Sequence, residues 1–361
     1  MIARSTAACI AACVVLLACA ASAFADPPLK VTSPDGKSSL SFGFLVQPQL
    51  EIQTTADGTD TSQNLYLRRI RLIFGGLATD KLSFFIETDS PNLGKDTSSG
   101  QKNAESPFLQ DVILTYAFRE AFQVDAGMLL VPLSHNTGQS AASLLALDFG
   151  PYSFVASEPT GSRNGRDYGV QARGYTFGRH LEYRLGVFQG HPDTQATSPF
   201  RYAARVVWYP FEADTGFFYS GTTLGARRIV AIGAGYDFQE RYAALALDAF
   251  LDQPLRGGNG LTLQADYIRY DGGRTLTQLA EQHTWLVEAG AYHKGTKLGP
   301  WVQVAGRTFP SGDPGETKVL AGLSYYALGH RFNIKAGAGS LIRSGSPSRA
   351  QFQVQAQWFW Y

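Results

Sequence analysis

The amino-acid sequence predicts an all-β protein, a transmembrane antiparallel β-barrel of sixteen strands. Three observations lead to this fold. After Ser39, apolar and polar residues alternate with a period of two in segments of about ten residues, the length of a barrel strand. An export signal precedes these segments. The chain also ends in an alternating segment that finishes on an aromatic residue.

The N-terminal 25 residues have the three parts of a secretory signal. Arg4 supplies the positive charge, residues 7–18 form the apolar region, and Ala23-Phe24-Ala25 provides the small residues at a cleavage site. We therefore expect a signal peptide over 1–25 and a barrel domain over 26–361. An alternative is lipidation of Cys19, which follows Leu16-Leu17-Ala18.

Composition limits the remaining possibilities. All three cysteines (Cys9, Cys13 and Cys19) lie in the signal segment, so the mature chain has no disulfide and no cysteine-based metal site. No later stretch approaches the roughly 18 apolar residues of a membrane helix, so a membrane location requires a closed barrel. The chain contains 38 Gly and 23 Phe, and its net charge of +1 gives no reason to expect nucleic-acid binding.

Sixteen segments carry the alternating pattern, and their even number would place both termini in the periplasm. They are 39–53, 65–78, 81–90, 108–118, 121–131, 167–177, 181–190, 200–210, 226–238, 241–252, 260–270, 282–293, 298–309, 317–327, 330–341 and 350–361. Tight connections, such as Thr79-Asp80, alternate with long ones. The count is least secure at 211–225, which is long for a periplasmic turn, and at Gln239-Glu240, which is short for an external loop.

A soluble β-sandwich is the main alternative fold. Bulky aromatic residues near the strand ends favour the membrane barrel instead, because such barrels carry aromatic girdles at both interfaces. These residues are Tyr66, Phe118, Tyr183, Trp208, Tyr267, Trp285, Tyr325 and Trp358. We therefore expect the outer membrane of a Gram-negative cell as the location, with lipid and lipopolysaccharide as partners.

The C-terminal segment 351–361 resembles the signal that the barrel insertion machinery reads. Its apolar residues, among them Trp358 and Trp360, are one residue out of phase with the terminal Tyr361. We therefore expect the insertion machinery to be a partner that recognises this strand. A homotrimer is one assembly that such a barrel can form.

Strand parity identifies the side chains that would line the lumen. The basic candidates are Arg69, Arg71, Arg173, Arg201, Arg205, Arg307, Arg331 and Lys335, and the acidic candidates are Glu87, Asp89, Asp111 and Asp125. We expect Arg69, Arg71, Arg307, Arg331 and Lys335 on one wall and the four acids on the opposite wall. Arg68 would reach out to the membrane interface. The arginines could either guide solutes or pair with neighbouring acids.

The connection 132–166 is the longest in the chain, and a loop of this length is usually functional. Its apolar residues would be poorly soluble if the loop pointed outward, so we expect it to fold into the barrel and narrow the channel. The constricting residues would be Leu144, Leu145, Phe149, Tyr152 and Phe154. A lid packed over the rim is the alternative.

Four segments carry a resemblance to a known family: YLRRIRLIFGGLATDKLSFFIETD (66–89), GMLLVPLS (127–134), RDYGVQARG (166–174) and ADYIRYDGG (265–273). Together they resemble the phosphate-selective porin O and P family. The resemblance implies a sixteen-stranded porin, and its phosphate-selective members use an arginine-rich constriction and a lysine ladder. Here the strands hold few lysines, and 132–154 holds no arginine or lysine.

These features indicate a channel for small polar or anionic solutes, with phosphate and other oxyanions among the candidates. No cofactor, metal or catalytic residue is expected. One alternative is a non-conducting structural or adhesion barrel. Another is a barrel hydrolase, for which only Ser134-His135 is suggestive. Neighbouring residues on a strand point in opposite directions, so this pair does not form a nucleophile and base.

Overall fold

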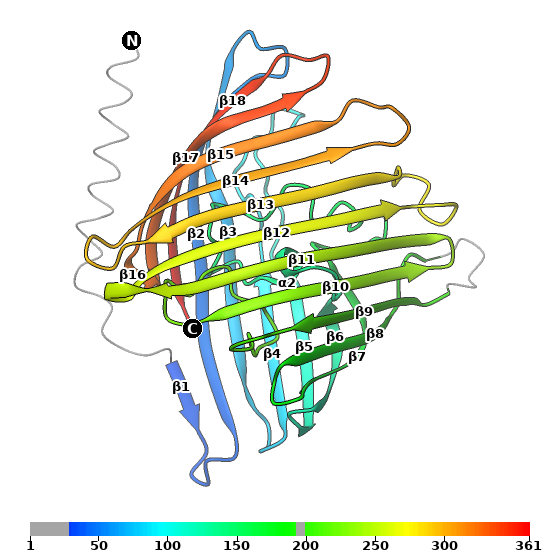
Figure 1. Cartoon of the computed structure of the whole chain (residues 1–361), viewed down its shortest axis with the longest axis vertical. Coiled ribbons are helices and arrows are strands. Elements are labelled where there is room, and N and C mark those ends of the chain that lie inside the picture. The colour runs from blue at the N-terminus through cyan, green and yellow to red at the C-terminus, as the bar shows by residue number, and fades with distance from the viewer. Residues whose placement is uncertain (1–28, 193–198) are drawn as a thin grey trace.

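The computed structural model describes residues 29–192 and 199–361, so the expected signal peptide lies outside the described residues. These ranges form antiparallel strands with little helix (Figure 1). The strands are β1 (Leu29–Thr32), β2 (Ser39–Thr54), β3 (Thr61–Leu77), β4 (Leu82–Asp89), β5 (Phe108–Arg119), β6 (Phe122–Leu130), β7 (Arg166–Thr176), β8 (Leu181–Phe188), β9 (Arg201–Trp208), β10 (Ile229–Gln239), β11 (Tyr242–Leu255), β12 (Asn259–Asp271), β13 (Gln282–Tyr292), β14 (Leu298–Thr308), β15 (Glu316–Tyr325), β16 (Ala327–His330), β17 (Phe332–Arg343) and β18 (Arg349–Trp360). The helical elements are α2 (His135–Gly138) and the short 3-10 turn η1 (Arg256–Gly258).

The prediction of a closed sixteen-stranded barrel is confirmed. Consecutive strands pair from β2 to β15, then through β17 to β18, and β18 pairs with β2 to close the barrel. In this closing pair Gln351 lies opposite Gln53 and Trp360 opposite Phe44. Two short strands were not predicted: β1 pairs antiparallel with the first residues of β2, and β16 lies in the turn between β15 and β17.

Strand β9 illustrates how side chains are sorted between the two faces. Arg201 and Arg205 are buried inside the barrel, whereas Tyr202 and Trp208 are exposed on the outside. An apolar outer surface and a polar interior suit a barrel surrounded by lipid that encloses a lumen.

No helix within residues 29–192 and 199–361 is long and apolar enough to cross a membrane.

The two doubtful connections are compatible with sixteen strands. Gln239 pairs with Tyr242, so β10 and β11 form a tight hairpin in which Glu240 has a left-handed backbone (φ 52°). Short turns join most of the strands at one end of the barrel, the short-turn end, and longer loops join most of them at the other, the long-loop end. The long connection 209–228 starts at the short-turn end, where the Tyr209 N–H donates to the carbonyl of His180 (2.8 Å). It then folds inward, which explains why it is longer than an ordinary turn.

The connection 131–165 also lies inside the barrel, as predicted. Helix α2 forms its first turn, and the Ser134 side chain caps the helix by accepting the N–H of Thr137. The loop passes close to β10, because a Cβ atom at Gly235 would lie only 1.9 Å from the carbonyl oxygen of Leu133. Glycine at this position therefore lets the loop backbone lie against the wall.

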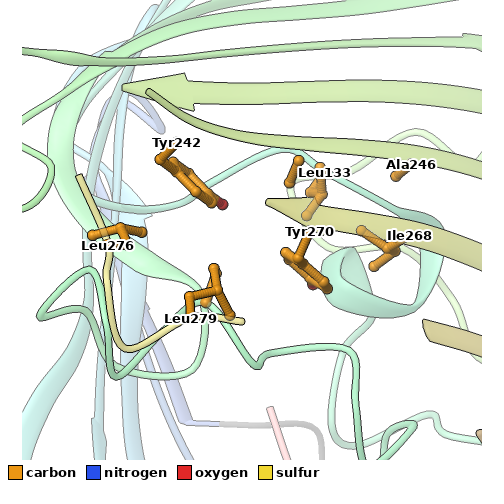
Figure 2. Close-up of a cluster of buried hydrophobic side chains, with 9 residues drawn as sticks. Leu133, Tyr242, Ala246, Ile268, Tyr270, Leu276 and Leu279 are labelled. Atoms are coloured by element: carbon orange, nitrogen blue, oxygen red, sulfur yellow. The ribbon is translucent and has the colours of Figure 1, made fainter. Parts of the chain in front are cut away.

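An apolar cluster attaches the first part of this loop to β11 and β12 (Figure 2). Leu133 packs there with Tyr242 and Tyr270, and the Tyr270 hydroxyl donates to the carbonyl of Ser153 (2.7 Å). Leu276 and Leu279, from the connection between β12 and β13, complete the cluster. Two loops from the long-loop end thus share one core.

The C-terminal aromatic residue turns into the lumen. In β18 the odd-numbered Gln353, Gln355 and Gln357 are buried inside the barrel, and Tyr361 continues this parity. Its ring lies 6.0 Å from that of Phe85. The phase shift seen in the sequence therefore has a structural reason, since Tyr361 faces the opposite side from the apolar residues Trp358 and Trp360.

We predict that Trp301→Ala destabilises the barrel much more than Trp208→Ala. Trp301, only 4% exposed, packs against Leu145 and Leu147 of the inward loop, whereas Trp208 is 50% exposed on the outer face. Loss of a buried tryptophan costs about 3–5 kcal/mol. Thermal unfolding in detergent, followed by the heat-dependent shift in electrophoretic mobility, measures the difference. Equal effects would show that the inward loop contributes little to stability.

Candidate functional site

A β-bulge places two consecutive arginines inside the barrel. Along the β2–β3 pair, Gln47 lies opposite Arg69 but Pro48 lies opposite Leu67, so Arg68 is the additional residue. A bulge of this kind redirects a side chain. The expectation that Arg68 reaches the membrane interface is therefore wrong, because its side chain points inward and contacts the loop.

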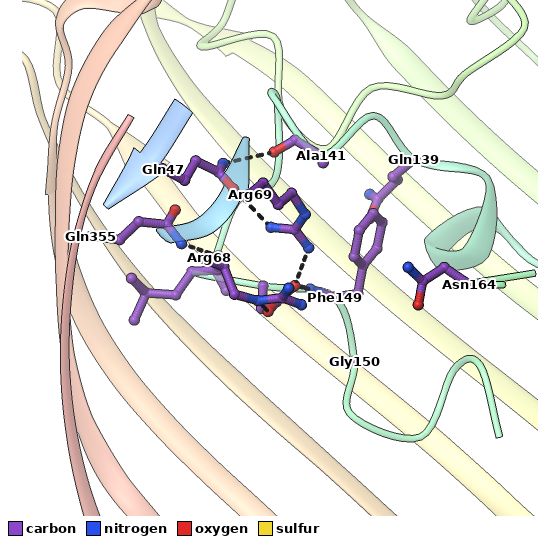
Figure 3. A network of polar contacts seen from close by, with 12 residues as sticks. Gln47, Arg68, Arg69, Gln139, Ala141, Phe149, Gly150, Asn164 and Gln355 are labelled. Atoms are coloured by element: carbon purple, nitrogen blue, oxygen red, sulfur yellow. Dashed lines mark hydrogen bonds and ion pairs between the residues drawn. The ribbon is translucent and has the colours of Figure 1, made fainter. Parts of the chain in front are cut away.

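Both arginines bind one carboxylate of the inward loop (Figure 3). The Nε of Arg68 and an Nη of Arg69 each lie 2.6 Å from a different oxygen of Asp148. Arg69 also donates to Gln47 (2.9 Å) and lies over the ring of Phe149. Burial raises the pKa of Asp148, but the two guanidinium groups outweigh this effect and hold that pKa well below its usual range.

The loop backbone is fixed by further donors from the wall. The ammonium group of Lys335 donates to the carbonyls of Leu144 and Ala146. Lys335, expected to line the pore, thus holds the loop. The side chain of Gln357 donates to the carbonyl of Ala142 (2.8 Å), and that of Gln303 to the carbonyl of Asp148 (2.9 Å).

The five expected constriction residues lie inside the barrel, but they do not play one common role. Leu144 and Leu145 are buried, and Leu145 packs against Trp301 and Leu320 of the wall. Tyr152 packs against Leu286 and Ala305, with the Arg307 guanidinium over its ring. Phe149 and Phe154 contact each other edge to face (5.3 Å). The apolar side chains thus attach the loop to the wall, which leaves Asp148 as its charged group near the lumen.

The segment 209–228 meets the inward loop from the opposite end. The Tyr219 N–H donates to the carbonyl of Gly138 (2.8 Å), and the Ser140 N–H donates to the carbonyl of Tyr219 (2.9 Å). The His135 ring stacks between Tyr219 and Phe250, at 5.0 and 4.1 Å. Two segments that enter from opposite ends are therefore joined inside the barrel.

Arg205 connects these two segments to the wall. It forms a bidentate pair with Asp248 (2.6 and 2.8 Å) and donates to the carbonyl of Leu133 (3.0 Å) and the hydroxyl of Tyr219 (3.1 Å). Its guanidinium group is thus shared by a strand, the inward loop and the segment 209–228.

The other expected charged residues mostly form ion pairs with neighbouring strands. The pairs are Arg71 with Glu87 and Asp89, Arg166 with Asp111, Arg173 with Asp125, Arg201 with Asp167 and Asp237, and Arg307 with Glu316. The expectation of opposite charged walls is wrong for Arg71, since β3 and β4 are adjacent and its guanidinium contacts the acids directly. Arg331 lies in the exposed turn before β17, outside the wall.

Two hollows lie on either side of the Asp148 contact. The lower one, toward the short-turn end, is lined by Arg71, Glu87, Arg166, Phe149 and Tyr361, among others. The upper one, toward the long-loop end, is lined by residues of β2, β3, β14, β15 and β18 and by Asn92 and Lys95 of the connection between β4 and β5. Residues 147–149 thus separate an upper from a lower compartment of the lumen.

The suggestive Ser134-His135 pair serves structural purposes. The Ser134 hydroxyl caps α2, and the His135 Nε2 lies 3.1 Å from the carbonyl oxygen of Ser220. Burial lowers the pKa of His135. Across the described residues, no three His, Cys, Asp or Glu side chains gather where they could hold a metal ion.

The sequence interpretation missed three contributors: Asp148, Arg68 and Tyr219. The sequence did indicate Asp148, because it is the sole acidic residue between positions 132 and 157, where there is also no arginine or lysine. Arg68 could not be assigned inward from strict parity, since a bulge shifts the alternation. Tyr219 lies in the connection 211–225, whose unusual length was the available indication.

We predict that Arg205→Ala lowers barrel stability by about 3–5 kcal/mol, because it leaves the Asp248 carboxylate buried without a partner. Arg269→Ala is the matched control: it removes an exposed pair with Glu281, a kind of pair that contributes about 0–1 kcal/mol. Chemical unfolding from lipid vesicles, followed by tryptophan fluorescence, compares the two. A similar loss in both variants would contradict the assigned role of Arg205.

Comparisons with known proteins agree with this architecture. Residues 47–259 match the profile of the phosphate-selective porin O and P family. No curated protein matches the sequence. Among solved structures, OprB of Pseudomonas putida has a TM-score of 0.64 at 10% identity, covering 89% of this chain and 94% of its own.

Two further structures have the same fold. An anion-selective porin from Comamonas acidovorans has a TM-score of 0.59 at 15% identity, covering 90% of this chain and 100% of its own. Salmonella typhi OmpF, solved with daunomycin, has a TM-score of 0.60 at 15% identity, covering 91% of this chain and 100% of its own. The family and the fold are those of channels rather than enzymes. The chain therefore belongs to the phosphate-selective porin O and P family and is a porin-like channel of the outer membrane.

Proposed function

We propose that the channel passes small anionic solutes and that their path runs through the upper and lower compartments, past Asp148. The observation that supports this path is the position of Asp148 and Phe149 between two hollows. The upper hollow has a mainly polar lining, and the lower one is lined by charged, polar and apolar side chains together. A solute that moves between the compartments along this wall must pass the Asp148 carboxylate and its two arginines.

The charges along the path favour anions. Five cationic side chains line the two compartments (Arg68, Arg71, Lys95, Arg166 and Lys318), against three anionic ones (Glu51, Glu87 and Asp148). An excess of one sign in a narrow, poorly screened passage attracts ions of the opposite sign. The arginines would then both brace the wall and guide solutes, because an ion-paired guanidinium still has free N–H donors.

Phosphate is one candidate among such anions, and the family name suggests it. The inward loop itself contributes no arginine or lysine between residues 132 and 154, so the cations that face the path come from the wall. We therefore propose a general preference for small oxyanions, with weaker discrimination than a continuous series of basic residues would give.

Replacing Asp148 by Asn should raise the anion-to-cation permeability ratio roughly fivefold at low salt. One unit charge about 4 Å away contributes about 1 kcal/mol even in water, and the change should shrink as salt screens it. The reversal potential of purified protein in a planar bilayer under a salt gradient measures the ratio.

Asp313→Asn is the matched control, because Asp313 lies exposed in the connection 309–315 and accepts only from Ser311 there. It should leave the reversal potential unchanged. An unaltered ratio in Asp148→Asn would place the ion path elsewhere in the barrel. A parent protein without any conductance would support the alternative, a structural or adhesion barrel.

We further propose that residues 1–25 are removed on export, that the C-terminal strand is read by the insertion machinery, and that lipid and lipopolysaccharide surround the barrel. We also propose a homotrimer. One solved structure of similar fold, OmpT of Vibrio cholerae, is described as a trimer form; it has a TM-score of 0.54 at 10% identity, covering 90% of this chain and 100% of its own. Native mass spectrometry from detergent should give three times the protomer mass, whereas a protomer mass would exclude the trimer.

A further inference from the structure

The upper compartment is a built polar pocket. It has a volume of about 220 Å³, which is room for a solute of a few heavy atoms. Its wall combines β2, β3, β14, β15 and β18, and residues 147–148 form its floor toward the lower compartment. A solute entering from the long-loop end reaches this pocket before it reaches the Asp148 contact.

Most charges in the pocket are already paired. The Glu51 carboxylate accepts from Lys95 (2.6 Å), from Gln353 (2.8 Å) and from the hydroxyl of Tyr66 (3.3 Å). Asp148 is held by Arg68 and Arg69. Both acidic groups of the pocket are therefore occupied by donors of the protein.

Lys318 is the exception among the cations. In the described part of the chain, its ammonium group has no ion pair within 4.0 Å and no hydrogen bond, and it interacts with Asp148 and Glu51 only through space. Arg68 also has free donors, because only its Nε is used by Asp148. The pocket thus offers one unpaired positive charge and the free Nη groups of a guanidinium.

These features select a class of ligand. A carboxylate matches the planar fork of a guanidinium, and an ammonium group adds a charge-assisted hydrogen bond. One unpaired cation balances a single negative charge, so a monoanion fits better than a dianion. An ammonium-bearing zwitterion fits less well, since Glu51 and Asp148 are both already paired.

We propose that the upper compartment is a binding subsite for small monocarboxylates, held by Lys318 and Arg68. This inference rests on the proposed function, because the subsite lies on the proposed anion path. Binding there would raise the local concentration of the solute before it reaches the Asp148 contact.

The test measures chloride current through the full-length mature protein in a planar bilayer while sodium acetate is added at constant ionic strength. In the parent protein acetate should reduce the chloride current with a saturating dependence. Lys318→Gln should raise the half-saturating acetate concentration about tenfold, the effect of losing one charge-assisted hydrogen bond. Lys318→Arg should restore most of the affinity, because it returns the charge and the donors.

Lys102→Gln is the control, since it removes the same charge from an exposed position in the connection between β4 and β5. It should leave the acetate response as in the parent. Folding of each variant is checked by its heat-dependent electrophoretic mobility. The subsite is disproved if Lys318→Gln responds to acetate like the parent, or if Lys102→Gln shows the same shift.

Other anions test the ligand class. If inorganic phosphate saturates the current at a lower concentration than acetate, the site prefers phosphate and the monocarboxylate assignment is wrong. Failure of the proposed function has a different signature, because the parent would then show no anion preference under a salt gradient. An anion-preferring parent without saturable acetate inhibition contradicts the subsite alone.

Discussion

The pairing of β18 with β2 is the constraint on which the rest of the structure depends. In lipid every backbone N–H and C=O must find a partner within the protein, and a sheet without edges achieves this. Closure also fixes the inner face, because each strand's alternation then divides residues between lipid and lumen. Pro48 interrupts this regularity, since it has no N–H to donate, and the adjacent bulge adds Arg68 to the inner face.

Charges inside such a barrel need partners. A buried charge without a partner is far more costly than the same charge in water, and the lumen contains many arginines. Most of them are matched by acids of the barrel wall, either on the adjacent strand, as Arg201 is by Asp237, or one strand further along, as Arg205 is by Asp248. The inward loop supplies partners in the same way. Asp148 forms ion pairs with two arginines of β3, and backbone carbonyls of the loop accept hydrogen bonds from Lys335.

The contacts between the inward loop and the wall also shape the lumen through which solutes pass. Apolar side chains such as Leu145 attach the loop to the wall and leave a carboxylate beside the path. Asp148 occupies the arginines as a permeating anion would, so solutes meet a passage whose strongest anion sites are partly filled by the protein itself. This arrangement favours the passage of anions over their tight binding, because conduction requires binding weak enough to release the ion.

The sequence alone determined the strand count, the inner face and the inward loop, because alternation and loop length are local properties of the chain. Parity assigned Arg69 and Arg71 to the inner face, and both side chains are buried in the structure. Their partners were decided by tertiary structure, since register and neighbouring strands bring Glu87 to Arg71. The bulge at Arg68, the contact of Asp148 and the inward course of 209–228 also depend on residues far apart in the chain, which no local pattern encodes.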